Sequence, residues 1–260
     1  MLNFTLLRHS TDLLFPAACP ICREETGIAG TICASCWRDV SFLGPNGCEG
    51  CGMPLEWSPD KAGSLCDDCL SYPRNWSQGR AVFSYEGAGR KLILALKHGD
   101  RSDLAPILGG WAMRAARDLV DSAEIIAPIP LHWTRRLKRR RNQSADIARW
   151  LAGKTGPRAK YLPRLLQRTR QTSSQDGKDR AARVANVQGA MKLARPTDVA
   201  NKRVLIVDDV MTTGATLNVA ARLCRDAGAE DVNILVLALV IHGDRYYMPD
   251  LTEDEAHETG

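Results

Sequence analysis

Apolar residues recur at two different spacings through the C-terminal two thirds of the chain. Short apolar runs rich in β-branched residues predict buried strands, and apolar residues three or four positions apart predict helices. The runs predict strands at 80–85, 125–131, 162–166, 204–207 and 231–241, and the helical spacing predicts helices at 90–98, 104–119, 145–151 and from 217 onward. This order of strands and helices is that of an α/β fold.

Residues 204–217 (VLIVDDVMTTGATL) combine a strand, two acids, a small polar loop and the start of a helix. Such a loop can direct backbone N–H groups and hydroxyls at a phosphate, helped by the positive end of the helix dipole. Gly214 lets the backbone approach the phosphate closely. Asp208 and Asp209 then lie within reach of the hydroxyls of an attached ribose. The alternative is a plain strand–helix turn in which the acids cap the helix.

The same segment resembles the binding signature of type I phosphoribosyltransferases, whose ligand is 5-phosphoribosyl-1-pyrophosphate (PRPP). The resemblance implies that Asp208 and Asp209 face the ribose hydroxyls and their Mg²⁺. It implies a mostly parallel sheet flanked by helices. It also implies that the following residues wrap the 5′-phosphate, namely Met211, Thr212, Thr213, Gly214, Ala215 and Thr216.

Eight of the nine cysteines lie between residues 19 and 69, all in C-x-x-C pairs. This spacing places two sulfurs on one tight turn, as tetrahedral Zn²⁺ requires, and two such pairs complete one site. Disulfides or an iron–sulfur cluster are the alternatives. Sequential pairing closes shorter loops than interleaved pairing and costs less entropy. We therefore expect two structural zinc sites with the ligands Cys19, Cys22, Cys33, Cys36, Cys48, Cys51, Cys66 and Cys69.

Length and composition indicate an ordinary globular protein. A chain of 260 residues accommodates one domain and a smaller module, and 44% hydrophobic and 25% charged residues are typical of soluble proteins. The longest apolar runs, 204–207 and 234–241, are too short to cross a bilayer. The N-terminus does not resemble a signal peptide, so we expect a cytoplasmic protein with reduced thiols.

Charge is distributed unevenly along the chain. Residues 19–69 carry three basic and eight acidic residues, whereas residues 131–183 carry sixteen basic and three acidic ones. The basic region should attract phosphate, pyrophosphate or a nucleic-acid backbone, although a solvated helix face explains any single arginine run. Residues 132–142 follow a strand and face the crevice where α/β sheets bind ligands. The expected pyrophosphate loop comprises Leu131, His132, Arg135, Arg136 and Arg139.

A long polar segment at 167–186 has Gly177 as a flexing point. Such an insertion next to a ligand crevice is often a lid, and a plain surface loop is the alternative. The expected lid residues are Arg170, Gln175, Arg180 and Arg183.

The order of these parts resembles the ComF family, also called the competence protein F or double zinc ribbon type. The resemblance rests on the cysteine pairs and on residues 97–100, 129–131 with Asn142 and Gln143, Thr172 and Gln175 with later Arg183 and Asn186, and 208–214. It covers residue 13 to about residue 240 and implies a double zinc ribbon at 18–72 and a phosphoribosyltransferase domain at 78–242. The residue pattern itself predicts an amphipathic helix at 1–17, a polar linker at 72–78 and a flexible acidic tail at 243–260.

The resemblance implies Mg²⁺-dependent transfer of the phosphoribosyl group of PRPP, with release of pyrophosphate, to an acceptor that the sequence does not identify. Arginines of the pyrophosphate loop would stabilise the leaving group. The alternative is a single-stranded DNA-binding competence factor on a PRPP-binding scaffold without turnover, with Trp133 and Trp150 available for base stacking. A regulator that senses PRPP is a third reading. Expected partners are PRPP and either single-stranded DNA or competence helicase machinery, and no membrane span is expected.

Overall fold

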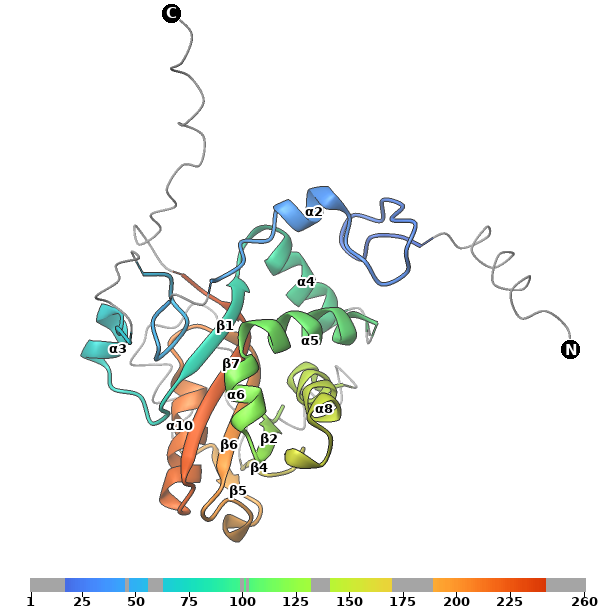
Figure 1. The fold of residues 1–260 in the computed structure, drawn as a ribbon. Coiled ribbons are helices and arrows are strands. Elements are labelled where there is room, and N and C mark those ends of the chain that lie inside the picture. The colour runs from blue at the N-terminus through green and yellow to red at the C-terminus, as the bar shows by residue number, and fades with distance from the viewer. Residues whose placement is uncertain are drawn as a thin grey trace, which may run out of the picture.

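The main sheet contains five parallel strands in the order β1-β7-β6-β2-β3 within the part of the chain that the structure describes (Figure 1). The structure is a computed structural model and describes residues 17–44, 47–55, 63–98, 101, 103–131, 141–169 and 189–241. The strands of this sheet are β1 (Gly79–Ser84), β2 (Ile125–Pro128), β3 (Lys160–Tyr161), β6 (Arg203–Met211) and β7 (Asp231–Leu239). A separate antiparallel pair is formed by β4 (Leu166–Arg168) and β5 (Met191–Leu193). The predicted α/β fold with a mostly parallel sheet is confirmed.

Both faces of the main sheet are buried. Successive side chains of a strand point to opposite sides, so each strand contributes apolar residues to both faces. In β6, Leu205 and Val207 join one hydrophobic cluster, whereas Val204 and Ile206 join another. This two-sided burial explains why the strand reads as an unbroken apolar run in the sequence.

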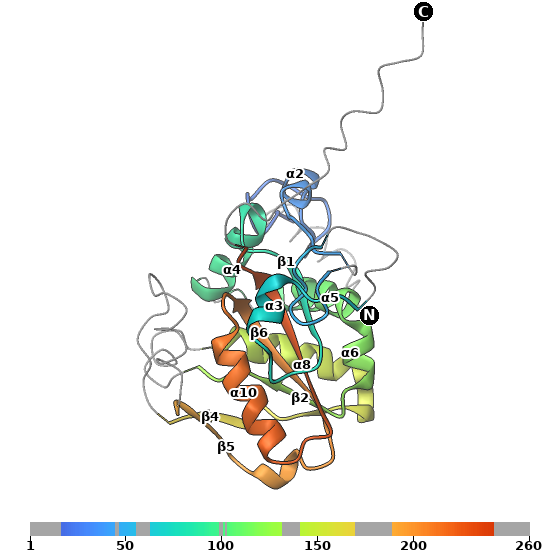
Figure 2. The same ribbon diagram turned by 90° about the vertical axis from the view of Figure 1, so that its left-hand side faces the viewer.

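Helices cover each face of the sheet (Figures 1 and 2). Side chains of α4 (Gly87–His98), α5 (Leu104–Ala115), α6 (Arg117–Ser122) and α8 (Gln143–Thr155) fill the first cluster. The second cluster contains the buried side of α10 (Ala215–Asp226), including Cys224, which is core as expected. The remaining short elements are α2 (Ala34–Arg38), α3 (Asp67–Ser71), η2 (Gly156–Arg158) and η3 (Pro196–Asp198).

Several predicted element boundaries differ from the structure, and three of the differences have a clear physical reason. The single helix predicted at 104–119 is two helices, because the backbone of buried Ala116 leaves the helical region at φ −134° and ψ 36°. Of the strand predicted at 162–166, only Leu166 lies in a strand, at the start of β4; residues 162–165 connect β3 to β4 and include Pro163, which has no N–H to donate to a sheet. Strand β6 does not end at Val207 but continues to Met211, because β7 pairs with it that far, so the two acids lie inside the strand.

Several predictions fall on residues outside the described ranges. These include residues 1–16 of the N-terminal helix, most of the pyrophosphate loop, the lid and the tail at 243–260. The domain boundaries remain predictions. Within the described ranges, no helix combines the length and apolar character needed to cross a bilayer.

Candidate functional site

A cavity of about 350 Å³ opens at the C-terminal edge of the main sheet. Tyr85, Ile129 and Val240 line it, and these residues follow β1, β2 and β7 directly. In α/β folds this edge is where ligands bind. All the predicted PRPP-binding residues line the cavity: Asp208, Asp209, Met211, Thr212, Thr213, Gly214, Ala215 and Thr216.

The loop at 212–214 connects β6 to α10 through a glycine with a left-handed backbone. Gly214 has φ +75° and is the N-cap of α10. A Cβ there would lie 3.0 Å from Trp76 Cη2 and 3.1 Å from Arg74 Nη1, so another residue type would meet both strain and contact. The first N–H groups of a helix have no partner within the helix. The start of α10 therefore presents donors for a phosphate beside the cavity.

Asp208 is held by two hydrogen bonds at the cavity wall. Its Oδ1 accepts from Ser144 Oγ at 2.9 Å and from the backbone N–H of Asp209 at 2.9 Å. Burial, reinforced by the negative charge of Asp209, raises the pKa of Asp208 to about 7. The acidic pair therefore carries more negative charge than its surroundings stabilise, which favours a cation at this position.

Asp209 already has one cationic neighbour in Lys97. Lys97 Nζ lies 3.3 Å from Asp209 Oδ2, and the two side chains are 18% and 16% exposed. Lys97 comes from the last turn of α4 and also lines the cavity. Lys97 belongs to residues 97–100, one of the segments that resemble the ComF family, but the sequence did not assign it to the site. Its ion pair with Asp209 was therefore not predicted.

Three further cavity residues with polar side chains were not predicted, because their contacts are not local in sequence. They are Tyr85, Ser144 and Arg168. Arg168 Nε donates to the carbonyl of Pro130 at 2.9 Å. The motif residues Asn142 and Gln143 form structural hydrogen bonds instead: they donate to the carbonyls of Ile129 and Leu96 at 2.9 and 3.2 Å.

The predicted pyrophosphate loop and lid are only partly within the described residues. Leu131 lines the cavity, and its role in binding pyrophosphate stays a prediction. The other loop residues (His132, Arg135, Arg136 and Arg139) and the lid residues (Arg170, Gln175, Arg180 and Arg183) lie outside the described ranges and stay predictions.

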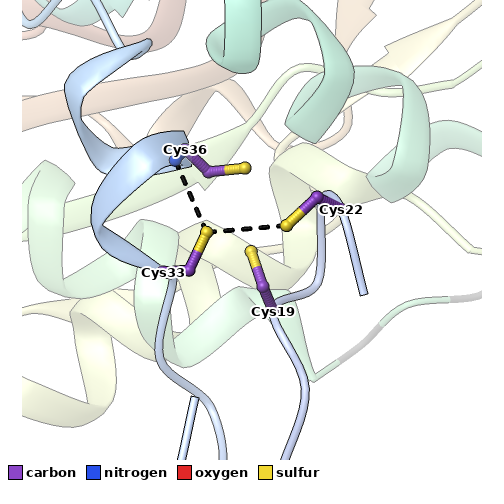
Figure 3. Close-up of side chains that lie close together, drawn as sticks. All are labelled: Cys19, Cys22, Cys33 and Cys36. Carbon is purple, nitrogen blue, oxygen red and sulfur yellow. Dashed lines mark hydrogen bonds between the residues drawn. The ribbon is translucent and has the colours of Figure 1, made fainter. Parts of the chain in front are cut away.

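The eight N-terminal cysteines form two groups, each with its sulfurs within 4.8 Å of one another. The first cysteine group is Cys19, Cys22, Cys33 and Cys36, and the second cysteine group is Cys48, Cys51, Cys66 and Cys69. The pairs therefore combine sequentially, as loop closure favours. Figure 3 shows the four sulfurs of the first group converging on one point.

Both groups fit a structural zinc ion. A tetrahedral site with Zn–S bonds of about 2.3 Å places neighbouring sulfurs about 3.8 Å apart. The Cys22 and Cys33 sulfurs are 3.5 Å apart, and those of Cys51 and Cys66 are 3.7 Å apart. The backbone N–H of Cys66 donates to Cys48 Sγ at 3.2 Å, a contact that favours the thiolate that zinc requires.

Comparisons with known proteins match both halves of this architecture. Residues 10–70 match the double zinc ribbon domain, and residues 158–254 match the phosphoribosyl transferase domain. Competence protein F of Haemophilus influenzae is 28% identical over 235 residues, covering 86% of this chain and 97% of the relative. DNA utilization protein YhgH of Escherichia coli K12 is 29% identical over 236 residues, covering 86% and 98%.

A third relative and a solved structure extend the comparison. Competence protein ComFC of Streptococcus pneumoniae is 26% identical over 208 residues, covering 79% of this chain and 86% of the relative. The solved structure described as the allosteric regulatory enzyme of purine biosynthesis is 20% identical with a TM-score of 0.37; the match covers 55% of this chain and 30% of that chain. The chain thus resembles these competence and DNA utilization proteins along nearly their whole length, and it carries a double zinc ribbon ahead of a phosphoribosyltransferase-type domain.

Proposed function

We propose that this protein binds PRPP with Mg²⁺ in the cavity beside α10 and transfers its phosphoribosyl group to an acceptor, releasing pyrophosphate. The observation that supports the proposal is that all eight residues of the predicted signature, from Asp208 to Thr216, line one cavity. Its volume of about 350 Å³ is within the usual range for small-molecule sites. The loop at 212–214 and the start of α10 would hold the 5′-phosphate.

The acidic pair has the donor chemistry that Mg²⁺ prefers. Asp208 and Asp209 offer carboxylate oxygens, and the raised pKa of Asp208 reports negative charge that a divalent cation would stabilise. When bound, Mg²⁺ supplies positive charge to the pyrophosphate group and the ribose hydroxyls. In the ligand-free protein Lys97 supplies part of that charge to Asp209.

The chemistry breaks the bond between C1′ and the pyrophosphate oxygen while a bond from C1′ to the acceptor forms. Positive charge develops on the sugar ring, and Asp208 and Asp209 lie where they can stabilise it. The pyrophosphate keeps the electron pair of the broken bond and leaves toward Leu131, from which the arginines of the predicted pyrophosphate loop follow. A closed lid would exclude water, which otherwise hydrolyses PRPP.

Calorimetry with Mg²⁺ and PRPP tests the binding part of this proposal. We expect the double variant Asp208→Asn, Asp209→Asn to lose roughly a hundredfold or more in affinity, because the ribose loses two charged acceptors. The control is Asp226→Asn, an exposed acid at the far end of α10. Unchanged affinity in the double variant would rule out this site. Pyrophosphate release with a panel of nucleobases, and with single-stranded DNA, tests turnover and acceptor.

A second candidate function is single-stranded DNA binding on the same scaffold without turnover. Relatives carry the names competence protein and DNA utilization protein. A second cavity of about 300 Å³ is lined by Trp37, Phe42 and Trp111 together with Arg80 and Arg114. Trp37 and Phe42 are 44% and 37% exposed. Exposed rings beside basic side chains are the combination that stacks bases and follows a phosphate backbone.

Of the two aromatic residues predicted for stacking, the structure describes only Trp150, which is packed against neighbouring side chains and helices. Trp150 packs against Gly109 of α5 and lies under Lys154, whose Nζ is 5.1 Å from the ring centroid. Trp133 is outside the described residues.

Fluorescence anisotropy with a labelled oligothymidine separates the two candidates. DNA binding should weaken steeply between 50 and 200 mM salt, by roughly a thousandfold if six or more phosphates are contacted, and should weaken in Trp37→Ala. A flat salt response, or displacement of the oligonucleotide by stoichiometric PRPP, would favour the small-molecule site alone. For both candidate functions we propose a cytoplasmic location, because thiols stay reduced there and can bind zinc.

A further inference from the structure

Arg74 lies between the second cysteine group and the loop at 212–214. Its Nη1 donates to the carbonyl of Thr213 at 2.8 Å, and its Nη2 donates to Asp68 Oδ2 at 2.6 Å. The side chain is only 9% exposed. The guanidinium fork thus joins the residue next to zinc ligand Cys69 to the backbone of the phosphate loop.

The second cysteine group holds Arg74 electrostatically as well as through Asp68. Arg74 is a buried cation, and its ion-pair partner Asp68, 2.6 Å away, immediately precedes the ligand Cys69 in the sequence. A zinc ion with four thiolates carries two net negative charges. The zinc-bound cysteine group would therefore carry negative charge, and this charge would stabilise the buried guanidinium of Arg74.

The loop rests directly on Arg74 and its neighbour Trp76. The Arg74 guanidinium lies over the Trp76 ring, with Cζ 5.4 Å from the centroid. Trp76 Nε1 donates to the carbonyl of Gly50, between two zinc ligands, at 2.6 Å. Gly214 touches both side chains, and any Cβ there would lie about 3 Å from each. The loop, the two side chains and the cysteine group therefore form one packed unit.

The polar segment at 72–78, predicted as a linker between domains, is fixed along α10. The Asn75 N–H donates to Asn218 Oδ1 at 2.7 Å, and Arg225 Nε donates to the carbonyl of Asn75 at 2.6 Å. Arg225 Nη2 also donates to Ser77 Oγ at 2.8 Å. Arg74 is therefore held relative to the helix that begins at the phosphate loop.

Arg74 also sets the direction of one loop peptide. In a trans peptide the carbonyl and the following N–H point in opposite directions. Since the Thr213 carbonyl points at Arg74, the N–H of Gly214 points away from the cysteine module. A phosphate-binding loop requires its N–H groups to be oriented in advance.

We propose that Arg74 is a positioning residue that couples zinc binding at the second cysteine group to the conformation of the 5′-phosphate loop. The second zinc site then acts on ligand binding as well as on folding. The consequence for ligand affinity rests on the proposed function, whereas the consequence for loop order does not.

The test compares zinc-loaded wild type with Arg74→Gln, Arg74→Lys and the control Arg203→Gln. Arg203 also bridges a carbonyl and a carboxylate, donating to Ser122 O at 2.8 Å and pairing with Glu124 at 3.6 Å. It lies at the other end of β6, away from the cavity. Lysine can reach one of the two acceptors of Arg74 but not both, so Arg74→Lys should restore part of the effect.

Hydrogen exchange of amides 212–216 without ligand should be about tenfold faster in Arg74→Gln than in wild type or Arg203→Gln. Ribose 5-phosphate, which uses the loop half of the site, should bind roughly tenfold more weakly, and pyrophosphate should bind as to wild type. Zinc content should stay at two ions per chain. If Arg74→Gln does not fold, Arg74→Lys carries the same comparison with a smaller change.

Unchanged exchange and unchanged ribose 5-phosphate affinity in both Arg74 variants would overturn the coupling. If wild type binds neither PRPP nor ribose 5-phosphate, the proposed function is wrong. In that case the exchange rates alone still decide whether Arg74 orders the loop.

Discussion

The two cysteine groups share one motif but differ in how deeply they enter the fold. In the first group Cys22 is exposed and Cys33 is half-buried, whereas all four cysteines of the second group are buried. The second group belongs to the same hydrophobic cluster as the α10 face of the sheet. The same zinc chemistry can therefore stabilise a peripheral loop in one case and part of the core in the other.

The contacts around the groups explain this difference. Near the first group, Ile21 and Ile32 pack only at the margin of the other hydrophobic cluster. Near the second group, the Gly79 N–H at the start of β1 donates to the carbonyl of Glu49 at 2.7 Å. This backbone hydrogen bond connects the second cysteine group directly to the first residue of β1, so the second group is the one whose loss should reach the candidate site.

The largest expected effect comes from removing one ligand from each group in turn. Cys51→Ser should lower the free energy of unfolding by about 4 kcal/mol, because a buried metal site inside a shared core is lost. Cys22→Ser should change global stability by only about 1 kcal/mol and unfold residues 17–36 locally. Urea unfolding and zinc analysis measure both. Equal losses of stability would contradict the distinction between the groups.

Chelation of the wild-type protein sharpens the same comparison. The exposed first group should release its zinc roughly tenfold faster than the buried second group, since a chelator needs access to the ligands. PRPP affinity should persist after the first ion leaves and fall by about tenfold or more when the second leaves. Timed zinc release followed by calorimetry checks this order. Loss of affinity with the first ion would show that the first group, too, supports the site.

Substitution at Gly214 tests the contact between the second group and the loop. Gly214→Ala combines left-handed strain of about 1 kcal/mol with contact against Trp76 and should weaken PRPP binding about tenfold. The matched control is Gly228→Ala, where φ is +83° but no atom lies within 4 Å of the added Cβ. Gly228→Ala should lower the free energy of unfolding by a similar amount through backbone strain and leave PRPP affinity unchanged. Similar affinities in the two variants would mean that the loop tolerates displacement.

The last and smallest effect on the site is expected from a change of pH, which acts on the Asp208 carboxylate. Asp208 has a raised pKa of about 7, so it binds a proton as pH falls through that value. Because Mg²⁺ and ribose require the carboxylate, PRPP affinity should fall about tenfold from pH 8 to pH 6. Ser144→Ala removes a hydrogen bond that lowers this pKa and should move the midpoint to higher pH. A flat profile over this range would remove Asp208 from the binding step.

The features that could be predicted from the sequence are those with local patterns. The run 204–217 shows its strand, acids and loop in order, and the shorter loops between C-x-x-C pairs favour the sequential pairing that the structure shows. The role of Arg74 could not be predicted, because its acceptor on Thr213 comes from a distant part of the chain. The end of β6 at Met211 depends on pairing with β7, and Lys97 reaches Asp209 only through the packing of α4.

The ion pair between Lys97 and Asp209 has a consequence for how a metal enters. A tethered ammonium already serves as the internal counter-ion of that carboxylate. The divalent ion proposed for this site would therefore exchange with a cation of the protein itself, and the displaced lysine would become available to the anionic part of the ligand.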